Sequence, residues 1–385
     1  MIERWIRPPR LRIIQDQAAD RRATWLELFF DLVFAAAVAD IGSRLSTDYT
    51  LLGLGRFGFQ FLLVWWAWIG HTYFSTRFDN DDPLHRFLTL GQVFLAAVMS
   101  VNASADLGSR EAAGFVAAYG GVRLLLAVQY GRVTSIPATR RFAWSQALLV
   151  ALGAFAWIGS GVVAPSWRVW LWSVALLIDL GTPFLARRLT ASPPIDPTHM
   201  VERFGLFTLI LFGQSVVAVM AGMRHRDVWT PGAAMSAILG LALAFALWWA
   251  YFDLLVAANP RSSPRWFPAW AATHLPLCFG IAVAAVGVEH AVARDGSIPL
   301  GSGAPFLVSG IAIVVLALGV LTITTPGVLV QRPAATIGRY FGLGLLMVPL
   351  VILGSGLMPV WLLGWLLGFG IAVNLMTTAP DPNIS

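Results

Sequence analysis

The sequence contains no lysine and few charged residues of any kind. Only 12% of its 385 residues are charged and 57% are hydrophobic, whereas a soluble domain carries roughly 25% charged residues. A chain with so little polar surface cannot cover a water-exposed globule. The scarcity of charge excludes a soluble enzyme and a secreted domain. It predicts an all-α integral membrane protein whose main partner is the lipid bilayer.

Cysteine and the motifs of metal and nucleotide chemistry are equally scarce. Cys278 is the only cysteine, so no intrachain disulfide is possible. The chain has no CxxC or HExxH spacing, no GxxxxGK[ST] loop and no GxSxG turn. We therefore predict neither a metal site nor a bound cofactor.

Apolar runs long enough to cross a bilayer recur from residue 24 to the end of the chain. A span needs roughly 20 mostly apolar residues, so twelve spans would use about 240 residues and leave only short loops. Residues 1–22 precede them as a basic arm suited to a headgroup layer. We predict about twelve transmembrane helices, at 24–44, 51–74, 86–105, 111–130, 142–163, 168–188, 202–222, 231–257, 268–290, 302–323, 335–355 and 359–377.

The net charge of +6 rests on arginine as the only strongly basic residue. With the N-terminus inside, eighteen of the 26 arginines fall in inner segments, seven fall in outer segments, and Arg123 lies within the fourth span. Basic residues accumulate in cytoplasmic loops, so both termini are predicted to be cytoplasmic. We predict no nucleic-acid partner, because no basic domain stands clear of the membrane.

The two halves of the chain carry similar marks in the same order. Glu27 opens the first predicted span and Glu202 opens the seventh, and paired tryptophans occur at 65–66 and again at 248–249. The longest linker, 189–201, separates the two sets of six spans. An even number of spans per half makes the repeats parallel in topology. We therefore predict a six-plus-six duplication with three parts, namely 1–22, 23–190 and 191–385.

Ionisable side chains within spans are costly and therefore informative. Glu27 and Asp31 lie four residues apart and share one helix face. With the N-terminus inside, nearly all the intramembrane ionisable residues lie in the cytoplasmic half. We predict an ion, proton or substrate site formed by Glu27, Asp31, His71, Glu202, Asp253 and His274. Secondary candidates are Asp179, Arg203, Gln214 and His85.

A structural interpretation of these residues is open at this point. Glu27 and Glu202 occupy first turns, where a carboxylate complements the helix dipole. A lone histidine in an apolar helix is more often a satisfied hydrogen-bonding group of the core than a ligand. Two histidines and several carboxylates at similar depth favour a shared site.

Several ordered segments resemble the bacterial low temperature requirement protein A family. They are Leu-Glu-Leu-Phe-Phe-Asp-Leu-Val-Phe at 26–34, the tryptophan-rich and acidic run at 65–86, Glu-Arg-Phe-Gly at 202–205, and Trp-Trp-Ala-Tyr-Phe-Asp at 248–253. The resemblance implies a multi-pass bacterial inner-membrane protein linked by name to growth in the cold, without an established activity. One departure is Gln214, which stands between Gly213 and Ser215 where the family usually has glutamate. A proton carrier at that position would be missing here.

Three functions fit these features. The duplicated halves, the buried carboxylates and the lack of a nucleotide-binding domain favour an ion- or proton-linked secondary transporter of an unknown small molecule. The same acids and histidines could serve as general acid and base in a membrane-embedded enzyme acting on a lipid or apolar substrate. A non-catalytic role in membrane adaptation is the third. A homo-oligomer fits any of the three.

Overall fold

The computed structural model describes residues 9–11, 23–79, 82–103, 108–224, 228, 230–256, 267–294, 298–325 and 334–378. Apart from residues 9–11, the predicted arm at 1–22 lies outside this part of the chain. The described chain is almost entirely helical, as the sequence predicts, and contains one short antiparallel strand pair. In that pair β1 (Arg10–Leu11) lies against β2 (Phe78–Asp79).

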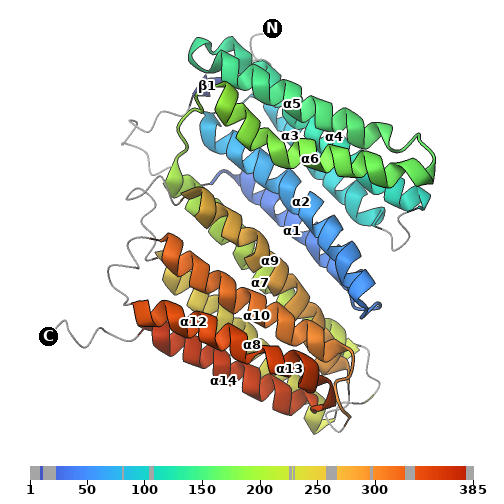
Figure 1. The fold of residues 1–385 in the computed structure, drawn as a ribbon, viewed down its shortest axis with the longest axis vertical. Coiled ribbons are helices and arrows are strands. Elements are labelled where there is room, and N and C mark those ends of the chain that lie inside the picture. The colour runs from blue at the N-terminus through green and yellow to red at the C-terminus, as the bar shows by residue number, and fades with distance from the viewer. Residues whose placement is uncertain are drawn as a thin grey trace, which may run out of the picture. The chain divides into compact units, whose positions relative to one another are not determined.

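The helices follow the predicted apolar runs closely (Figure 1). The first seven are α1 (Trp25–Leu45), α2 (Leu51–Arg77), α3 (Pro83–Val101), α4 (Arg110–Arg132), α5 (Arg140–Gly159), α6 (Pro165–Leu189) and α7 (Pro197–Arg224). The later ones are α8 (Pro231–Val256), α9 (Phe267–Ala293), α10 (Gly303–Thr324), α12 (Ala334–Leu346), α13 (Val348–Leu353) and α14 (Pro359–Thr378). Helix α7 begins at residue 197 instead of the predicted 202, and the predicted span 335–355 is broken near Met347.

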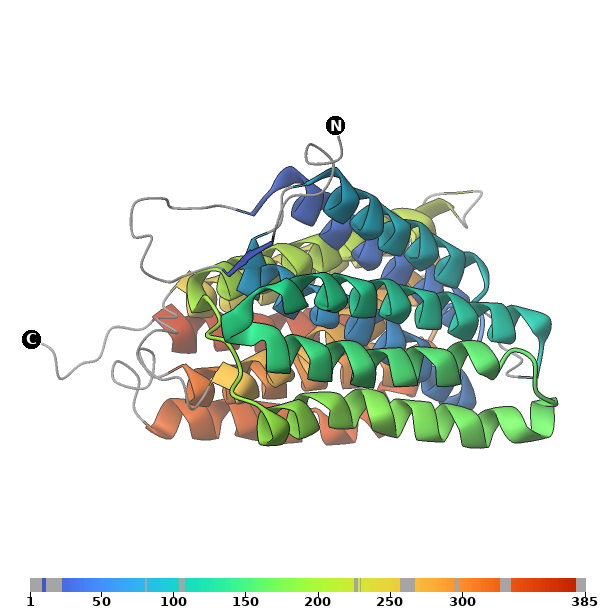
Figure 2. The ribbon, with the colours of Figure 1, turned by 90° about the horizontal axis from the view of Figure 1, so that it is seen from above.

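The chain packs as two compact units. The first unit comprises residues 1–41 and 59–203, and the second comprises residues 42–58 and 204–385. Within the first unit, α3, α4, α5 and α6 pack in chain order, each against the next (Figures 1 and 2). Within the second unit, α9 packs against α10, and α8 packs against α14. The predicted six-plus-six repeat, with its boundary at residue 190, stays a prediction.

Ten helical segments of the described chain are long and apolar enough to cross a membrane. Helix α1 does not qualify because it carries Glu27, Asp31, Asp40 and Arg44. The apolar stretch of α14, Pro359–Val373, is shorter than the ten and is not counted among them. The chain is therefore a membrane protein with many apolar helices, and the count of twelve spans stays a prediction.

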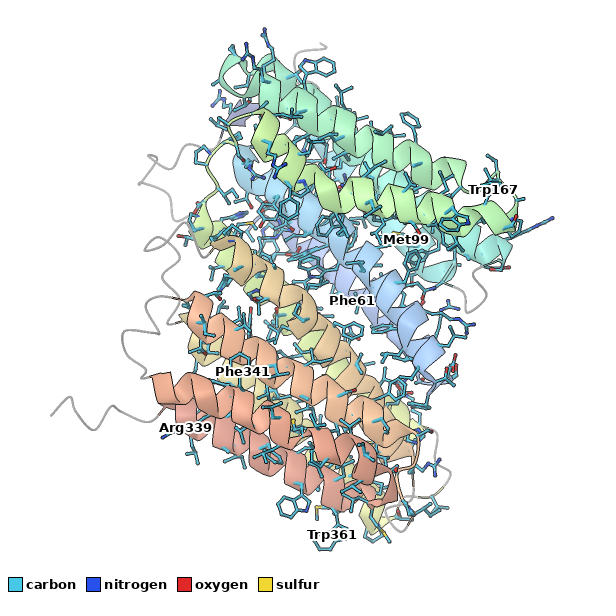
Figure 3. The ribbon with its side chains drawn as sticks, in the orientation of Figure 1. Phe61, Met99, Trp167, Arg339, Phe341 and Trp361 are labelled. Atoms are coloured by element: carbon cyan, nitrogen blue, oxygen red, sulfur yellow. The ribbon has the colours of Figure 1, made fainter. Side chains whose placement is uncertain are left out.

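Large apolar side chains on the outside of both units suit contact with lipid. Trp167 of α6 and Trp361 of α14 are 68% and 67% exposed, and Figure 3 shows both at the outer edge of their units. Exposed apolar patches of this kind are rare on soluble monomers. Their presence agrees with the low charge of the sequence.

Helix starts follow from local capping chemistry. Thr24 and Glu27 form a capping box, in which Thr24 N–H donates to Glu27 Oε2 at 2.8 Å and Glu27 N–H donates to Thr24 Oγ1 at 3.3 Å. The Asp82 side chain accepts from His85 N–H, and Pro83 occupies the first turn of α3. These contacts satisfy amides that the helix itself leaves without acceptors.

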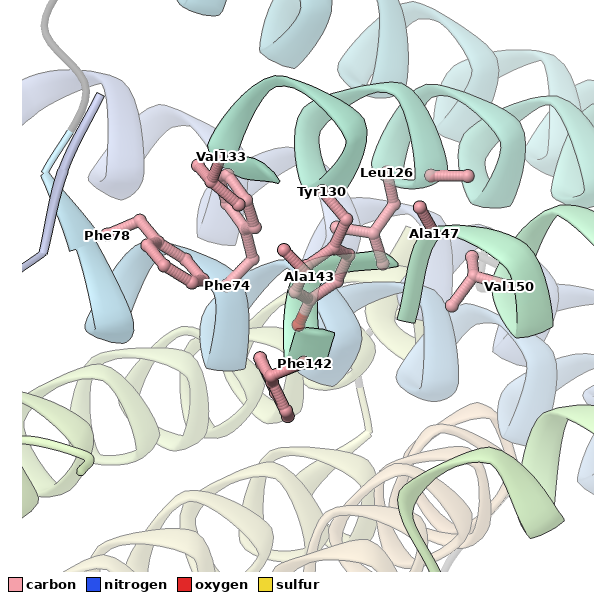
Figure 4. Close-up of a cluster of buried hydrophobic side chains, with 10 residues drawn as sticks. Phe74, Phe78, Leu126, Tyr130, Val133, Phe142, Ala143, Ala147 and Val150 are labelled. Carbon is pink, nitrogen blue, oxygen red and sulfur yellow. The ribbon is translucent and has the colours of Figure 1, made fainter. Parts of the chain in front are cut away.

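An aromatic cluster forms part of the core of the first unit (Figure 4). Phe74 of α2 meets Tyr130 of α4 edge to face, with ring centroids 5.1 Å apart, and Phe142 of α5 contacts the same tyrosine at 6.2 Å. Such pairs add to the burial of area. The cluster joins α2, α4 and α5 beside the polar residues described below.

In the second unit, α9 and α10 approach so closely that glycine is required. A Cβ at Gly287 would lie 2.5 Å from the Cα of Leu307, and one at Gly310 would lie 2.5 Å from the backbone nitrogen of Ala284. Small residues let backbones approach in membrane helix pairs, where packing replaces the hydrophobic effect. These glycines explain why α9 and α10 are closely packed.

Candidate functional site

The first part of the site is an acidic face on the first two turns of α1. Glu27 and Asp31 are one turn apart, and they are 6% and 0% exposed. The capping box places Glu27, because its carboxylate must turn back toward the backbone of Thr24. Asp31 is carried into the interior one turn later, and two carboxylates therefore share a small buried space.

Arg203 of α7 lies opposite this face and bridges both carboxylates. Its Nε donates to Asp31 Oδ2 at 2.9 Å and its Nη2 to Asp31 Oδ1 at 2.5 Å, while Nη1 lies 3.4 Å from Glu27 Oε1. The bidentate geometry is the strong form of the arginine–carboxylate interaction. Arg203 is fully buried, so the desolvation of its charge is offset by these carboxylates and by Ser75, whose Oγ accepts from Nη1 at 3.3 Å.

Two further side chains complete the group. Trp68 of α2 donates its indole N–H to Asp31 Oδ1 at 2.7 Å. His199, one turn before Arg203 on α7, places Nε2 3.5 Å from Glu27 Oε2. We call Glu27, Asp31, Trp68, His199 and Arg203 the carboxylate–arginine cluster. It draws on α1, α2 and the start of α7, and all of it lies in the first unit.

The formal charges of the cluster do not balance. Two carboxylates face one guanidinium, so with a neutral His199 the cluster carries one excess negative charge. The N-terminal dipole of α1 offsets about half a charge at most. One added proton, held by His199 or by a carboxylate, brings the group to neutrality, which a buried setting strongly favours.

A second buried aspartate, Asp179 of α6, belongs to a group whose formal charges balance. Arg123 of α4 donates to its Oδ1 through Nε at 3.1 Å and Nη2 at 2.8 Å. Tyr119 donates to Oδ2 at 2.7 Å and Trp157 at 2.9 Å. One carboxylate meets one guanidinium, and both oxygens accept two bonds. This Asp179–Arg123 pair ties α4, α5 and α6 together without excess charge.

His71 and His85 lie in the first unit. The His71 ring stacks on Phe30 with ring centroids 4.2 Å apart. Phe30 directly precedes Asp31 in the chain. His85 stacks on His71 at 6.3 Å. The structure therefore places the predicted His71 beside the secondary candidate His85, on α2 and α3, and His71 lies against α1 through Phe30.

Glu202, also in the first unit, binds the backbone before α1. Its Oε1 accepts the backbone N–H of Ala23 at 3.1 Å, just before the start of α1. Its side chain is half-buried. The contact ties the segment before α1 to the first turns of α7.

The remaining predicted residues lie in the second unit. His274 of α9 has Nδ1 2.9 Å from the Trp270 carbonyl, which can only accept, so Nδ1 carries the proton. In the neutral ring Nε2 then accepts from Tyr251, at 3.1 Å. Both ring nitrogens are satisfied, which is the structural interpretation of a buried histidine. Asp253 is half-buried near the end of α8.

Gln214 is half-buried on α7 beside a small apolar cavity. Its neighbour Ser215 lines this cavity of about 20 Å³ together with Phe212, Gly240 and Ile281. Ser215 is the single polar side chain of its lining, so the cavity offers too few polar partners to hold a water molecule. No group of three or more His, Cys, Asp or Glu side chains within the described residues could hold a metal ion.

Sequence reasoning does not find His199, which contacts Glu27, and it places Arg203 only second. It also misses four polar partners of the two aspartates, namely Trp68, Tyr119, Arg123 and Trp157. His199 was overlooked because α7 starts earlier than predicted. Asp196-Pro197 was the missed signal, since Asp196 Oδ1 accepts from Thr198 N–H at 2.9 Å and proline suits a first turn. Arg123, which lies well inside the predicted span 111–130, needed a buried carboxylate partner. The indole donors Trp68 and Trp157 had no distinguishing pattern.

An uncharacterized protein of Rhizobium meliloti (strain 1021) is 27% identical to the chain, over 71% of this chain and 70% of that protein. No solved structure matches the chain. The sequence profile of the bacterial low temperature requirement A proteins matches residues 22–378. The resemblance noted in the sequence thus extends almost to the C-terminus, and the chain belongs to the bacterial low temperature requirement A family.

Proposed function

We propose that the protein is a proton-linked secondary transporter of a small molecule in the bacterial inner membrane. The observation that carries this proposal is the charge imbalance of the carboxylate–arginine cluster. Two buried carboxylates share one arginine, so the cluster gains stability by binding one proton. Intramembrane ionisable groups of this kind serve as proton relays in transporters. The proposal includes twelve spans, a six-plus-six repeat and cytoplasmic termini.

The Asp179–Arg123 pair supplies an internal contrast. It is neutral as a pair, and every carboxylate oxygen already accepts two bonds. An added proton would break bonds there without relieving excess charge. Proton binding is therefore assigned to the cluster at Asp31 and a structural role to Asp179.

Protonation of the cluster couples to helix movement in a simple way. A proton on Asp31 weakens the bidentate contact with Arg203, and that contact joins α1 to the start of α7. Breaking a buried ion pair costs about 3–5 kcal/mol, so proton occupancy can decide whether the two helices stay joined. A transporter uses such a contact to link proton binding to a change of access.

Proton uptake is the first test. Purified protein in detergent with a pH indicator is shifted from about pH 8 to about pH 6, where ordinary exposed carboxylates stay ionised. Asp31→Asn and Glu27→Gln each remove the charge imbalance, so each should take up one proton fewer than the unaltered protein. Asp40→Asn is the matched control, because Asp40 is an exposed acid on the same helix, bonded to Ser100 at 2.7 Å. Equal uptake in all four proteins would contradict the proposal.

Transport is the second test. Proteoliposomes containing a pH-sensitive dye receive monovalent cations, amino acids and organic acids in turn. A transporter should move protons in response to one solute class, and Asp31→Asn should not. Proton uptake without any solute-linked flux would favour a membrane-embedded enzyme or a membrane-adaptation protein.

A further inference from the structure

Helix α3 carries polar residues on its buried side and apolar residues on its outer side. His85, Thr89 and Gln92 are spaced four and three residues apart, so they share one face. They are 9%, 1% and 0% exposed. On the other side Phe87 and Phe94 are largely exposed. A lipid-facing helix with an inward polar stripe commonly borders a polar interior.

This stripe is hydrogen-bonded to α4. Gln92 Nε2 donates to Gln129 Oε1 at 3.2 Å, and Gln129 Nε2 donates to Thr89 Oγ1 at 3.2 Å. The His71 ring of α2 stacks on His85 of this stripe. We call His71, His85, Thr89, Gln92 and Gln129 the polar chain, and every member lies in the first unit.

Among the described residues, two buried atoms on His71 and Gln92 of the polar chain have no hydrogen-bond partner in the protein. They are Gln92 Oε1 and His71 Nδ1, on residues that are 0% and 1% exposed. Buried polar atoms are ordinarily satisfied by protein or by ordered water. Two such atoms, one on α2 and one on α3, point to bound water, since a buried water typically makes about three hydrogen bonds.

The polar chain has charged groups at both ends. At the start of α3, Asp82 Oδ1 accepts from His85 N–H at 2.9 Å, and the Asp82 carboxylate pairs with Arg132 at 2.5 Å. At the other end His71 stacks on Phe30, whose neighbour is Asp31. The centroids of His71 and His85 are 6.3 Å apart, which is too far for a direct bond and suits an intervening water.

We propose that the polar chain binds water and conducts protons between the Asp82 end of α3 and the carboxylate–arginine cluster. Each imidazole or water accepts a proton on one side and releases another from its opposite side, so no group in the chain changes its net charge after a transfer. The inference rests on the proposed function for the proton's destination. Hydration of the chain can be tested separately.

Hydroxyl-radical footprinting of the unaltered protein tests hydration. Radicals generated from bound water label adjacent side chains, so His71 should be labelled despite being 1% exposed. His274 is the matched control, because it is 0% exposed and both its ring nitrogens are bonded to protein. Equal absence of label at His71 and His274 would overturn the proposal, whatever the cluster does.

Proton kinetics test conduction. Gln92→Met keeps the side-chain length but removes the amide, and it should slow proton uptake after a pH jump by on the order of 100-fold, the size of effect a positioned proton-transfer group supplies. The amount of proton bound should not change. Thr89→Val is a second variant should the first fail to fold, and Val93→Ala, beside Gln92 on α3, is the control. An unchanged rate in folded Gln92→Met and Thr89→Val would overturn conduction.

The outcomes separate the two proposals. Loss of the bound proton in Asp31→Asn with a normal rate in Gln92→Met supports the cluster and contradicts the polar chain as its route. If the unaltered protein takes up no extra proton, the proposed function fails. In that case, labelling of His71 would still show that the polar chain is hydrated, whereas absence of label at His71 would contradict its hydration as well.

Discussion

The Arg203 guanidinium binds both carboxylate oxygens of Asp31, with Nε 2.9 Å from Oδ2 and Nη2 2.5 Å from Oδ1. The two residues are 172 positions apart in the chain and both are fully buried. Because Glu27 also contacts Arg203, this guanidinium is shared between two acids. That sharing distinguishes the cluster from an ordinary structural ion pair.

Replacing Asp31 should abolish proton-linked activity. Asp31→Asn keeps the shape of the side chain and leaves Glu27 and Arg203 as a balanced pair, so the reason for binding a further proton disappears. Solute-driven proton flux in proteoliposomes should fall to the level of protein-free vesicles. Asp40→Asn should retain the flux, and retained flux in folded Asp31→Asn would remove Asp31 from the proposed mechanism.

The Asp179–Arg123 pair should behave as a structural element. Asp179→Asn leaves a buried guanidinium without its counter-charge, and it should lower the free energy of unfolding by about 3–5 kcal/mol. Arg123→Met added to Asp179→Asn removes the unpaired charge and keeps an amide oxygen that can still accept from Tyr119 and Trp157, so it should recover most of that loss. Thermal unfolding in detergent measures both. A double variant no more stable than the single one would mean that the pair does more than balance charge.

The approach of α9 and α10 should depend on Gly287. Its added Cβ would lie 2.5 Å from the Leu307 backbone, and backbone cannot move aside as a flexible side chain can. Gly287→Ala should therefore destabilise the protein by about 1–3 kcal/mol, the usual cost of overpacking.

Gly181 supplies the control for this substitution. A Cβ there meets nothing within 4 Å, and alanine favours a helix over glycine by up to about 1 kcal/mol. Gly181→Ala should leave the melting temperature unchanged or raise it. If both variants melt alike, the packing of α9 on α10 is not limited by Gly287.

The positions of the termini can be checked directly. Eighteen of the 26 arginines lie on the predicted inner side, so a reporter fused after Ser385 should be active in the cytoplasm. A paired reporter that works only in the periplasm should be silent at the same position. The reverse pattern would invert the predicted topology.

Much of the fold could be predicted because composition and hydropathy act locally. A helix in lipid satisfies its own backbone, so an apolar run of sufficient length predicts a helix without reference to its neighbours. The predicted runs at 51–74 and 231–257 match α2 and α8 within three residues at each end. The predicted start of α7 is five residues too late, because the proline-rich segment before residue 202 resembles a linker, whereas Pro197 occupies the first turn of the helix.

Composition and hydropathy are enough to assign this chain to a membrane, to locate its helices and to single out the unusual acids, because those properties depend on each residue and its near neighbours. The sequence also placed the chain in its family through residues spread along its length. Only the tertiary structure decided that Asp31 pairs with Arg203 and Asp179 with Arg123. Partners 172 and 56 residues apart share no local sequence pattern. A buried aspartate therefore becomes part of a charged site or of a neutral structural ion pair according to the side chains that folding places beside it.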